Sequence, residues 1–127
     1  MATILVIDDD TQIRHMLRRA LERQGHEILD AREGAEGLRL FREKRVDLVI
    51  TDILMPEMEG LACIRELRLA DPGIRVIAIS GGGSQNFKLD VLGVARRLGA
   101  TATLNKPFKL EELTQVVREE LEHRKAA

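Results

Sequence analysis

The chain has 127 residues, the size of one domain, and its 44 % apolar content is enough for a single core and too high for a disordered chain. Twenty basic residues against 21 acidic ones give a net charge of −1, so binding to nucleic acid through phosphate contacts is not expected. Aromatic residues make up 2 %, with neither Trp nor Tyr, which argues against a site that stacks bases or sugars on rings. One cysteine, Cys63, leaves no internal disulfide and no thiolate metal cluster.

The sequence contains no apolar run of about 18 residues and does not begin like a signal peptide. We therefore expect a cytoplasmic protein. We also expect one domain over residues 1–127, with no output domain after it, because only about five residues follow the last predicted helix.

The first strand–helix unit begins with an apolar run at residues 3–7, which is typical of a strand buried on both faces of a parallel sheet. Three aspartates at positions 8–10 end the run. Thr11 is predicted to cap the following helix, whose apolar residues recur at helical spacing until Gly25 ends it.

Four more units repeat this alternation. Their strands are predicted at residues 26–30, 48–50, 76–79 and 102–104. Their helices are predicted after Gly34, after a loop containing Pro56 and Gly60, across Val91 to Leu98, and from Leu110 to Leu121. Five such units with short joints predict an α/β fold, a doubly wound parallel sheet with helices on both faces.

Polar side chains follow four of the predicted strands. The first strand ends at the three aspartates, the third at Asp52, the fourth at Ser80 and the fifth at Lys106. Because the carboxyl ends of parallel strands share one edge of the sheet, we expect these groups to meet there.

Several close carboxylates repel one another, and a single lysine does not offset three negative charges. Mg²⁺, which binds one or two carboxylates together with waters and phosphate oxygens, would offset them. A carboxylate beside such a metal has the chemistry to attack phosphorus and form an acyl phosphate. Ser80 and Lys106 would then each contact a phosphoryl oxygen.

Each of these features alone has an ordinary structural explanation. Aspartates after a strand commonly cap the next helix, and Lys-Pro commonly forms a turn. The occurrence of all four at the ends of predicted strands favours a functional site.

The following segments carry a family resemblance: Val6-Ile7-Asp8-Asp9-Asp10, Thr51-Asp52-Ile53-Leu54-Met55-Pro56-Glu57-Met58-Glu59-Gly60, Ile79-Ser80-Gly81 and Asn105-Lys106-Pro107-Phe108. In this order they resemble the receiver domain of bacterial two-component response regulators, a resemblance that covers the chain from Ile4 to about Leu121. The fold implied is the flavodoxin-like five-stranded parallel sheet with strand order 2-1-3-4-5 and five helices.

The resemblance implies that Asp52 is the phosphoacceptor, which takes a phosphoryl group from a histidine kinase or a histidine phosphotransfer protein. Ser80 is similar to the hydroxyl that turns toward the phosphoryl group, and Lys106 to the lysine that contacts its oxygen. The bond from Lys106 to Pro107 is expected to be cis, as in the family. Such a domain is a signalling phosphoacceptor that catalyses only its own Mg²⁺-dependent phosphorylation and dephosphorylation.

The resemblance also implies a Mg²⁺ site. Asp9, Asp52 and the backbone carbonyl of Leu54 correspond to direct ligands, and Asp8 to the acid that holds the metal through water. Asp10 lies where the family varies, and we expect it near the helix cap.

Three features depart from the family pattern. Thr103 stands where receivers often carry a Tyr or Phe that switches with the hydroxyl. The segment after Ser80 contains Gly81–Gly83, and its length suggests either a switch loop or a surface insertion. The first helix carries four arginines against one glutamate, which is either a docking face for the kinase or a solvated face.

The phosphorylated domain is expected to switch contacts with a downstream protein or with an output domain on another chain, through the face made by the fourth helix, fifth strand and fifth helix. Alternatives are a degenerate receiver that binds its partner regardless of phosphorylation, and a small Mg²⁺-dependent phosphohydrolase. A DNA-binding regulator has the least support, given the balanced charge.

Overall fold

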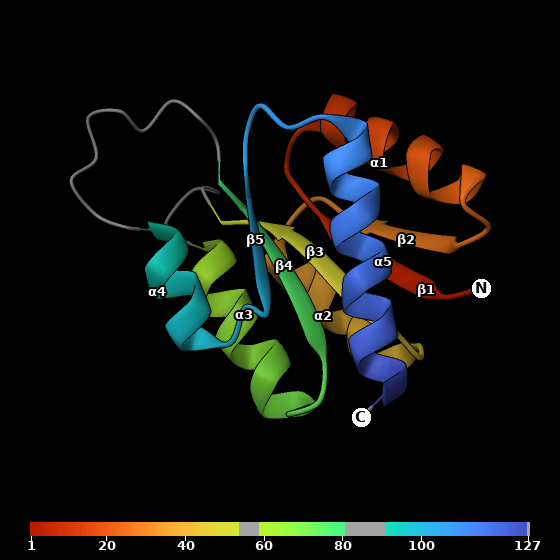
Figure 1. The fold of residues 1–127 in the computed structure, drawn as a ribbon. Helices are drawn as coiled ribbons and strands as arrows, with labels where there is room; N and C mark the ends of the chain where they lie inside the picture. The colour runs from red at the N-terminus through yellow and green to blue at the C-terminus, as the bar shows by residue number, and fades with distance from the viewer. Residues whose placement is uncertain (54–58, 81–90, 127) are drawn as a thin grey trace.

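A computed structural model describes residues 1–53, 59–80 and 91–126. Strands and helices alternate along the chain as β1 (Thr3–Ile7), α1 (Thr11–Arg23), β2 (Glu27–Ala31), α2 (Gly34–Glu43), β3 (Leu48–Asp52), α3 (Glu59–Ala70), β4 (Arg75–Ser80), α4 (Val91–Leu98), β5 (Ala102–Asn105) and α5 (Leu110–Ala126). All strand pairings in the sheet are parallel, and the order is β2-β1-β3-β4-β5 (Figure 1). The sheet, its order and its five helices confirm the predicted fold.

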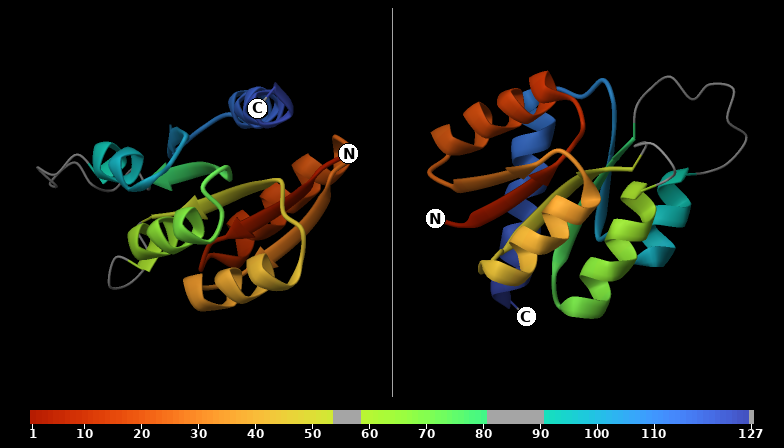
Figure 2. Two further views of the ribbon diagram at one scale, coloured as in Figure 1. Left: turned by 90° about the horizontal axis from the view of Figure 1, so that it is seen from below. Right: turned by 180° about the vertical axis from the view of Figure 1, so that it is seen from behind.

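The central strands are apolar on both faces because both faces are covered. Alternate residues of a strand point to opposite sides, so Ile4 and Val6 pack with α1 and α5, while Leu5 and Ile7 pack with α2 and α3. Helices α1 and α5 lie together on one side of the sheet, and α2, α3 and α4 lie on the other (Figure 2). This layering leaves the carboxyl edge of the sheet to the loops.

The cap of α1 differs from the prediction. Asp10, not Thr11, is the N-cap: its backbone is extended, and its carboxylate accepts bonds from the amides of Gln12 and Ile13. The Thr11 hydroxyl instead accepts a bond from Arg14 Nη2. A carboxylate at this position also favours the positive end of the helix dipole.

Three element boundaries also shift. Strand β2 begins one residue later than predicted, at Glu27, and β3 continues to Asp52, which pairs in register with Ile79 of β4. Helix α3 begins at Glu59, so Gly60 belongs to its first turn and not to the preceding loop. Within the described ranges, none of the helices combines the length and apolar character needed to cross a membrane.

Candidate functional site

Two buried aspartates lie side by side at the carboxyl edge of the sheet. Asp8 directly follows β1, and Asp52 is the last residue of β3, whose neighbour Thr51 pairs with Ile7. Their exposed fractions are only 1 % and 6 %, whereas Asp9 is exposed. Asp8, Asp9 and Asp52 each place one carboxylate oxygen within 4.8 Å of the other two.

The ammonium of Lys106 completes this acidic cluster. Its Nζ lies 3.2 Å from Asp52 Oδ2 and 3.5 Å from Asp8 Oδ2. Its backbone amide donates a bond of 2.8 Å to the carbonyl of Ser80, which joins the end of β5 to the end of β4. The Lys106–Pro107 peptide is cis, as expected.

Burial and the charges of the cluster shift two pKa values. Burial raises the pKa of Asp8 to about 6, and the Asp52 carboxylate adds to this effect, although the Asp10 amide and Lys106 act against it. Burial acts to lower the pKa of Lys106, but the carboxylates of Asp52 and Asp8 outweigh it and raise that pKa. Lys106 is therefore a cation at neutral pH, and it pairs with two of the three carboxylates of the cluster.

The donor set fits a hard divalent cation. Mg²⁺ prefers carboxylate oxygens in near-octahedral geometry and keeps several of its waters. The exposed Asp9 opens one side of the cluster to solvent, and Asp8 and Asp52 close the other. Leu54, whose carbonyl the resemblance makes a third ligand, lies outside the described residues.

Ser80 lies on the strand next to Asp52, one residue beyond its partner in register. It is the last residue of β4 and is buried, with 5 % of its surface exposed. Because parallel strands lie about 4.8 Å apart, this register places the hydroxyl residue, the aspartate and Lys106 on three neighbouring strand ends. The Gly81–Gly83 segment, predicted as a switch loop or an insertion, lies outside the described residues.

A close backbone contact sets the path of the chain around Asp52. A Cβ atom on Gly60 would lie 2.3 Å from the carbonyl oxygen of Asp52 and 2.4 Å from Cα of Ile53. These are backbone atoms, which do not move aside cheaply. The first turn of α3 therefore packs directly on the end of β3, and only glycine fits there.

We predict that Gly60→Ala lowers the free energy of unfolding by about 1–3 kcal/mol, because the added methyl group must displace the backbone beside Asp52. Urea denaturation followed by circular dichroism measures this loss. Gly73→Ala is the matched control, since the nearest atom to its added Cβ, a side-chain oxygen of Asp71, is 3.5 Å away. Equal stability of the two variants would contradict the contact's importance.

At the departure from the family pattern on β5, the Thr103 hydroxyl accepts a bond of 3.1 Å from Arg96 Nη2 on α4. Thr103 is half-buried, so it neither fills the volume of a ring nor stands free in solvent. A polar link between α4 and β5 thus occupies the aromatic position.

The arginines of α1 do not lie on one exposed face of the helix. Arg14 is buried, with 7 % of its surface exposed, and Arg18 pairs with Asp30 at 3.1 Å and with Glu22 at 3.4 Å. Arg19 and Arg23 are exposed and form no ion pair with the residues that the structure describes. The local charge available to a partner is therefore smaller than the sequence suggests.

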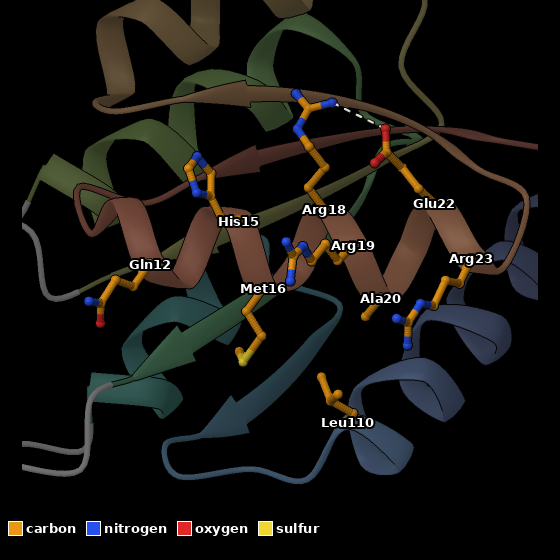
Figure 3. Close-up of a pocket in the computed structure, with 9 residues that line it drawn as sticks. All are labelled: Gln12, His15, Met16, Arg18, Arg19, Ala20, Glu22, Arg23 and Leu110. Atoms are coloured by element: carbon orange, nitrogen blue, oxygen red, sulfur yellow. Dashed lines mark hydrogen bonds and ion pairs between the residues drawn. The ribbon is translucent and has the colours of Figure 1, made fainter.

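A shallow groove of about 690 Å³ runs along α1 to the start of α5. Figure 3 shows Met16, Ala20 and Arg23 on the side of α1 toward Leu110, which is 47 % exposed. Met16 also lines a neighbouring groove together with Lys106. Met16 thus borders both the groove along α1 and the groove that includes Lys106.

Two buried charged residues, Arg14 and Glu120, were not among the site residues predicted from the sequence. Arg14 lies on the same helical stripe as Leu17 and Leu21, a spacing that indicates burial. Glu120 of α5 is 5 % exposed and pairs with Arg75 at 2.9 Å; it also accepts a bond from the Thr101 hydroxyl. Glu120 joins α5 to the opposite end of the sheet from the acidic cluster, where β4 begins.

Comparison with known proteins gives a consistent result. The family model described as the response regulator receiver domain matches residues 4–118. The chain is 38 % identical to the sensor kinase CckA of Brucella abortus, over 95 % of this chain and 13 % of that protein. It is 30 % identical to the sporulation initiation phosphotransferase F of Bacillus subtilis, over 93 % of this chain and 92 % of that protein.

The fold is likewise similar to solved structures. A receiver domain protein from Clostridium thermocellum superposes with a TM-score of 0.89 at 35 % identity, over 99 % of this chain and 98 % of that chain.

Proposed function

We propose that Asp52 accepts a phosphoryl group, starting from the fact that this chain belongs to the receiver domain family of response regulators. Receiver domains are signalling domains of two-component systems. The relatives of this chain include a sensor kinase and transcriptional regulators. The single observation that carries the proposal is the juxtaposition of Asp52 with two further aspartates and with Nζ of Lys106 at 3.2 Å.

The proposed reaction follows from these groups. One Asp52 oxygen attacks phosphorus of a phosphohistidine; the new O–P bond forms as the N–P bond breaks, and the departing imidazole takes up a proton. Lys106 lies where it would neutralise an oxygen of the transferred group, and Ser80 lies on the adjacent strand end to donate a hydrogen bond. Asp8, Asp9 and Asp52, with the carbonyl of Leu54, would hold Mg²⁺, which supplies charge neutralisation when bound.

The donor in this proposal is a histidine kinase or a histidine phosphotransfer protein. Its phosphohistidine must reach the exposed side of the acidic cluster, and one of the two grooves beside α1 is lined by Met16 and Lys106. The exposed Arg19 and Arg23 line the other groove, where they are available to an acidic surface of the donor. A phosphoryl group on Asp52 adds about 1.5–2 negative charges, which a downstream protein or output domain would read on the face of α4, β5 and α5.

The test is labelling by a small phosphoryl donor. Wild-type protein is expected to form a hydroxylamine-sensitive acyl phosphate with phosphoramidate or acetyl phosphate only when Mg²⁺ is present, and Asp52→Asn to form none. Asp10→Asn is the matched control, since asparagine also caps helices and this residue serves as the α1 cap. It should label like the wild type on a phosphate-affinity gel.

Unlabelled wild-type protein under these conditions would overturn the proposal and leave a module that binds its partner regardless of phosphorylation. Rapid release of inorganic phosphate from small esters without a phosphoprotein would instead indicate a phosphohydrolase.

A further inference from the structure

Arg14 is a buried cation directly behind the acidic cluster, and the proposed chemistry does not use it. It lies in the first half of α1, and only 7 % of its surface is exposed. Burial of a guanidinium costs free energy unless its N–H groups find partners. The position of those partners shows what this burial achieves.

The guanidinium links the loop between β1 and α1 to the first residue of α1. Nη1 donates a bond of 2.7 Å to the backbone carbonyl of Asp8, and Nη2 donates one of 3.1 Å to the Thr11 hydroxyl. A planar fork with two donors holds two acceptors in a fixed relation. Arg14 thus joins the first residue of the loop, Asp8, to the first residue of α1, Thr11.

The carbonyl of Asp8 belongs to the same rigid peptide plane as the amide of Asp9. Fixing that oxygen therefore fixes the direction in which the chain leaves toward Cα of Asp9. Asp9 is the exposed member of the cluster. The amide of Asp10 donates to Asp8 Oδ1 at 2.8 Å, which secures the other side of the same turn.

We propose that Arg14 is a positioning residue: it holds the Asp8–Asp9 peptide so that the Asp9 carboxylate stands within reach of Asp8 and Asp52 before a divalent cation binds. The inference rests on the Mg²⁺ site of the proposed function. Arg14 touches none of the carboxylate oxygens through the bonds described above, so its effect passes through the backbone.

The direction in which Mg²⁺ affinity changes when Arg14 is replaced distinguishes a positioning role from a purely electrostatic one. A guanidinium near three carboxylates repels an incoming cation, so removal of its charge alone would strengthen Mg²⁺ binding. Loss of positioning weakens binding, since outer groups that orient metal ligands typically contribute 10–100-fold to affinity.

The experiment is isothermal titration calorimetry of the full chain with MgCl₂; the absence of Trp and Tyr makes calorimetry preferable to intrinsic fluorescence. Arg14→Met is expected to raise the Kd for Mg²⁺ about tenfold. Arg14→Lys, which keeps the charge but lacks the fork, should fall between Arg14→Met and the wild type. Arg19→Met removes an exposed arginine from the same helix and should bind no more weakly than the wild type.

Thermal unfolding without Mg²⁺, followed by circular dichroism, controls for folding. A merely structural role lowers Tm in Arg14→Met and leaves the Kd of the folded protein unchanged, which overturns the inference. An equal or lower Kd in Arg14→Met overturns it as well. If Arg14→Met does not fold, the Kd of Arg14→Lys decides alone. Wild-type protein that binds no Mg²⁺ refutes the metal site itself, a distinct result visible before any variant is compared.

Discussion

In protein freed of divalent cations, Asp8→Asn is expected to raise the free energy of unfolding at about pH 7.5 by on the order of 1–3 kcal/mol. The ionised Asp8 carboxylate is buried beside Asp52, and both conditions penalise its charge. Asparagine occupies nearly the same volume without that charge, and it keeps an oxygen for the bond from the Asp10 amide.

The size of this effect depends on pH in a defined direction. The pKa of Asp8 is about 6 in the folded protein and 3.8 ordinarily, so between these values the folded chain binds a proton that the unfolded chain has lost. The contribution of Asp8 to stability is therefore full below about pH 4 and is lost as the pH rises through 6. The difference between Asp8→Asn and wild type should grow over this window and stay constant above it.

Urea denaturation at a series of pH values measures that difference, and addition of MgCl₂ provides the second arm. Binding to the folded state stabilises the wild type according to its affinity, whereas Asp8→Asn, with one carboxylate fewer, should gain much less. A difference that does not change between pH 4 and pH 7 would contradict the assignment of the raised pKa to Asp8.

Lys106→Met is expected to slow labelling of Asp52 by a small phosphoryl donor about 100-fold, the cost typical of losing one preorganised donor to a developing anion. The same variant should unfold more easily by about 1–3 kcal/mol, because Asp8 and Asp52 lose the cation that lies between them. It should nonetheless bind Mg²⁺ more tightly, since a competing positive charge has been removed.

Damage to the fold alone would not slow labelling and at the same time tighten Mg²⁺ binding. Lys109→Met, at an exposed lysine three residues along the chain, is the matched control and should change none of the three quantities. Labelling at the wild-type rate with saturating Mg²⁺ would show that the ammonium takes no part in the transfer.

The alternation of strands and helices and the clustering of the polar strand ends were predictable because both follow from local pattern. Fully apolar strands require cover on both faces, and this requirement, with right-handed crossovers, leaves few arrangements of five units. Asp52 ends a strand, and Asp8 and Lys106 each directly follow one, so the parallel sheet itself brings them to one edge. The resemblance then added the strand order and the cis peptide.

Side-chain partners were less predictable, since they depend on distances between elements. The arginines of α1 read as a single charged face, although Arg14 follows the buried stripe and Arg18 reaches Asp30 on β2. The bond from Arg96 to Thr103 joins two elements whose relative placement the sequence pattern does not specify. The cap moved from Thr11 to Asp10 because adjacent residues can both satisfy a capping pattern.

The amide of Lys106 donates to the carbonyl of Ser80 at 2.8 Å, although 26 positions separate the two residues in the sequence. This bond ties the backbone of Lys106 to the end of β4, so its attachment point there does not depend on the number of residues between Ser80 and α4. Insertions or deletions in that interval should therefore leave Asp52 and Lys106 on neighbouring strand ends. The length of the interval and the chemistry at Asp52 can change separately, in evolution or by design.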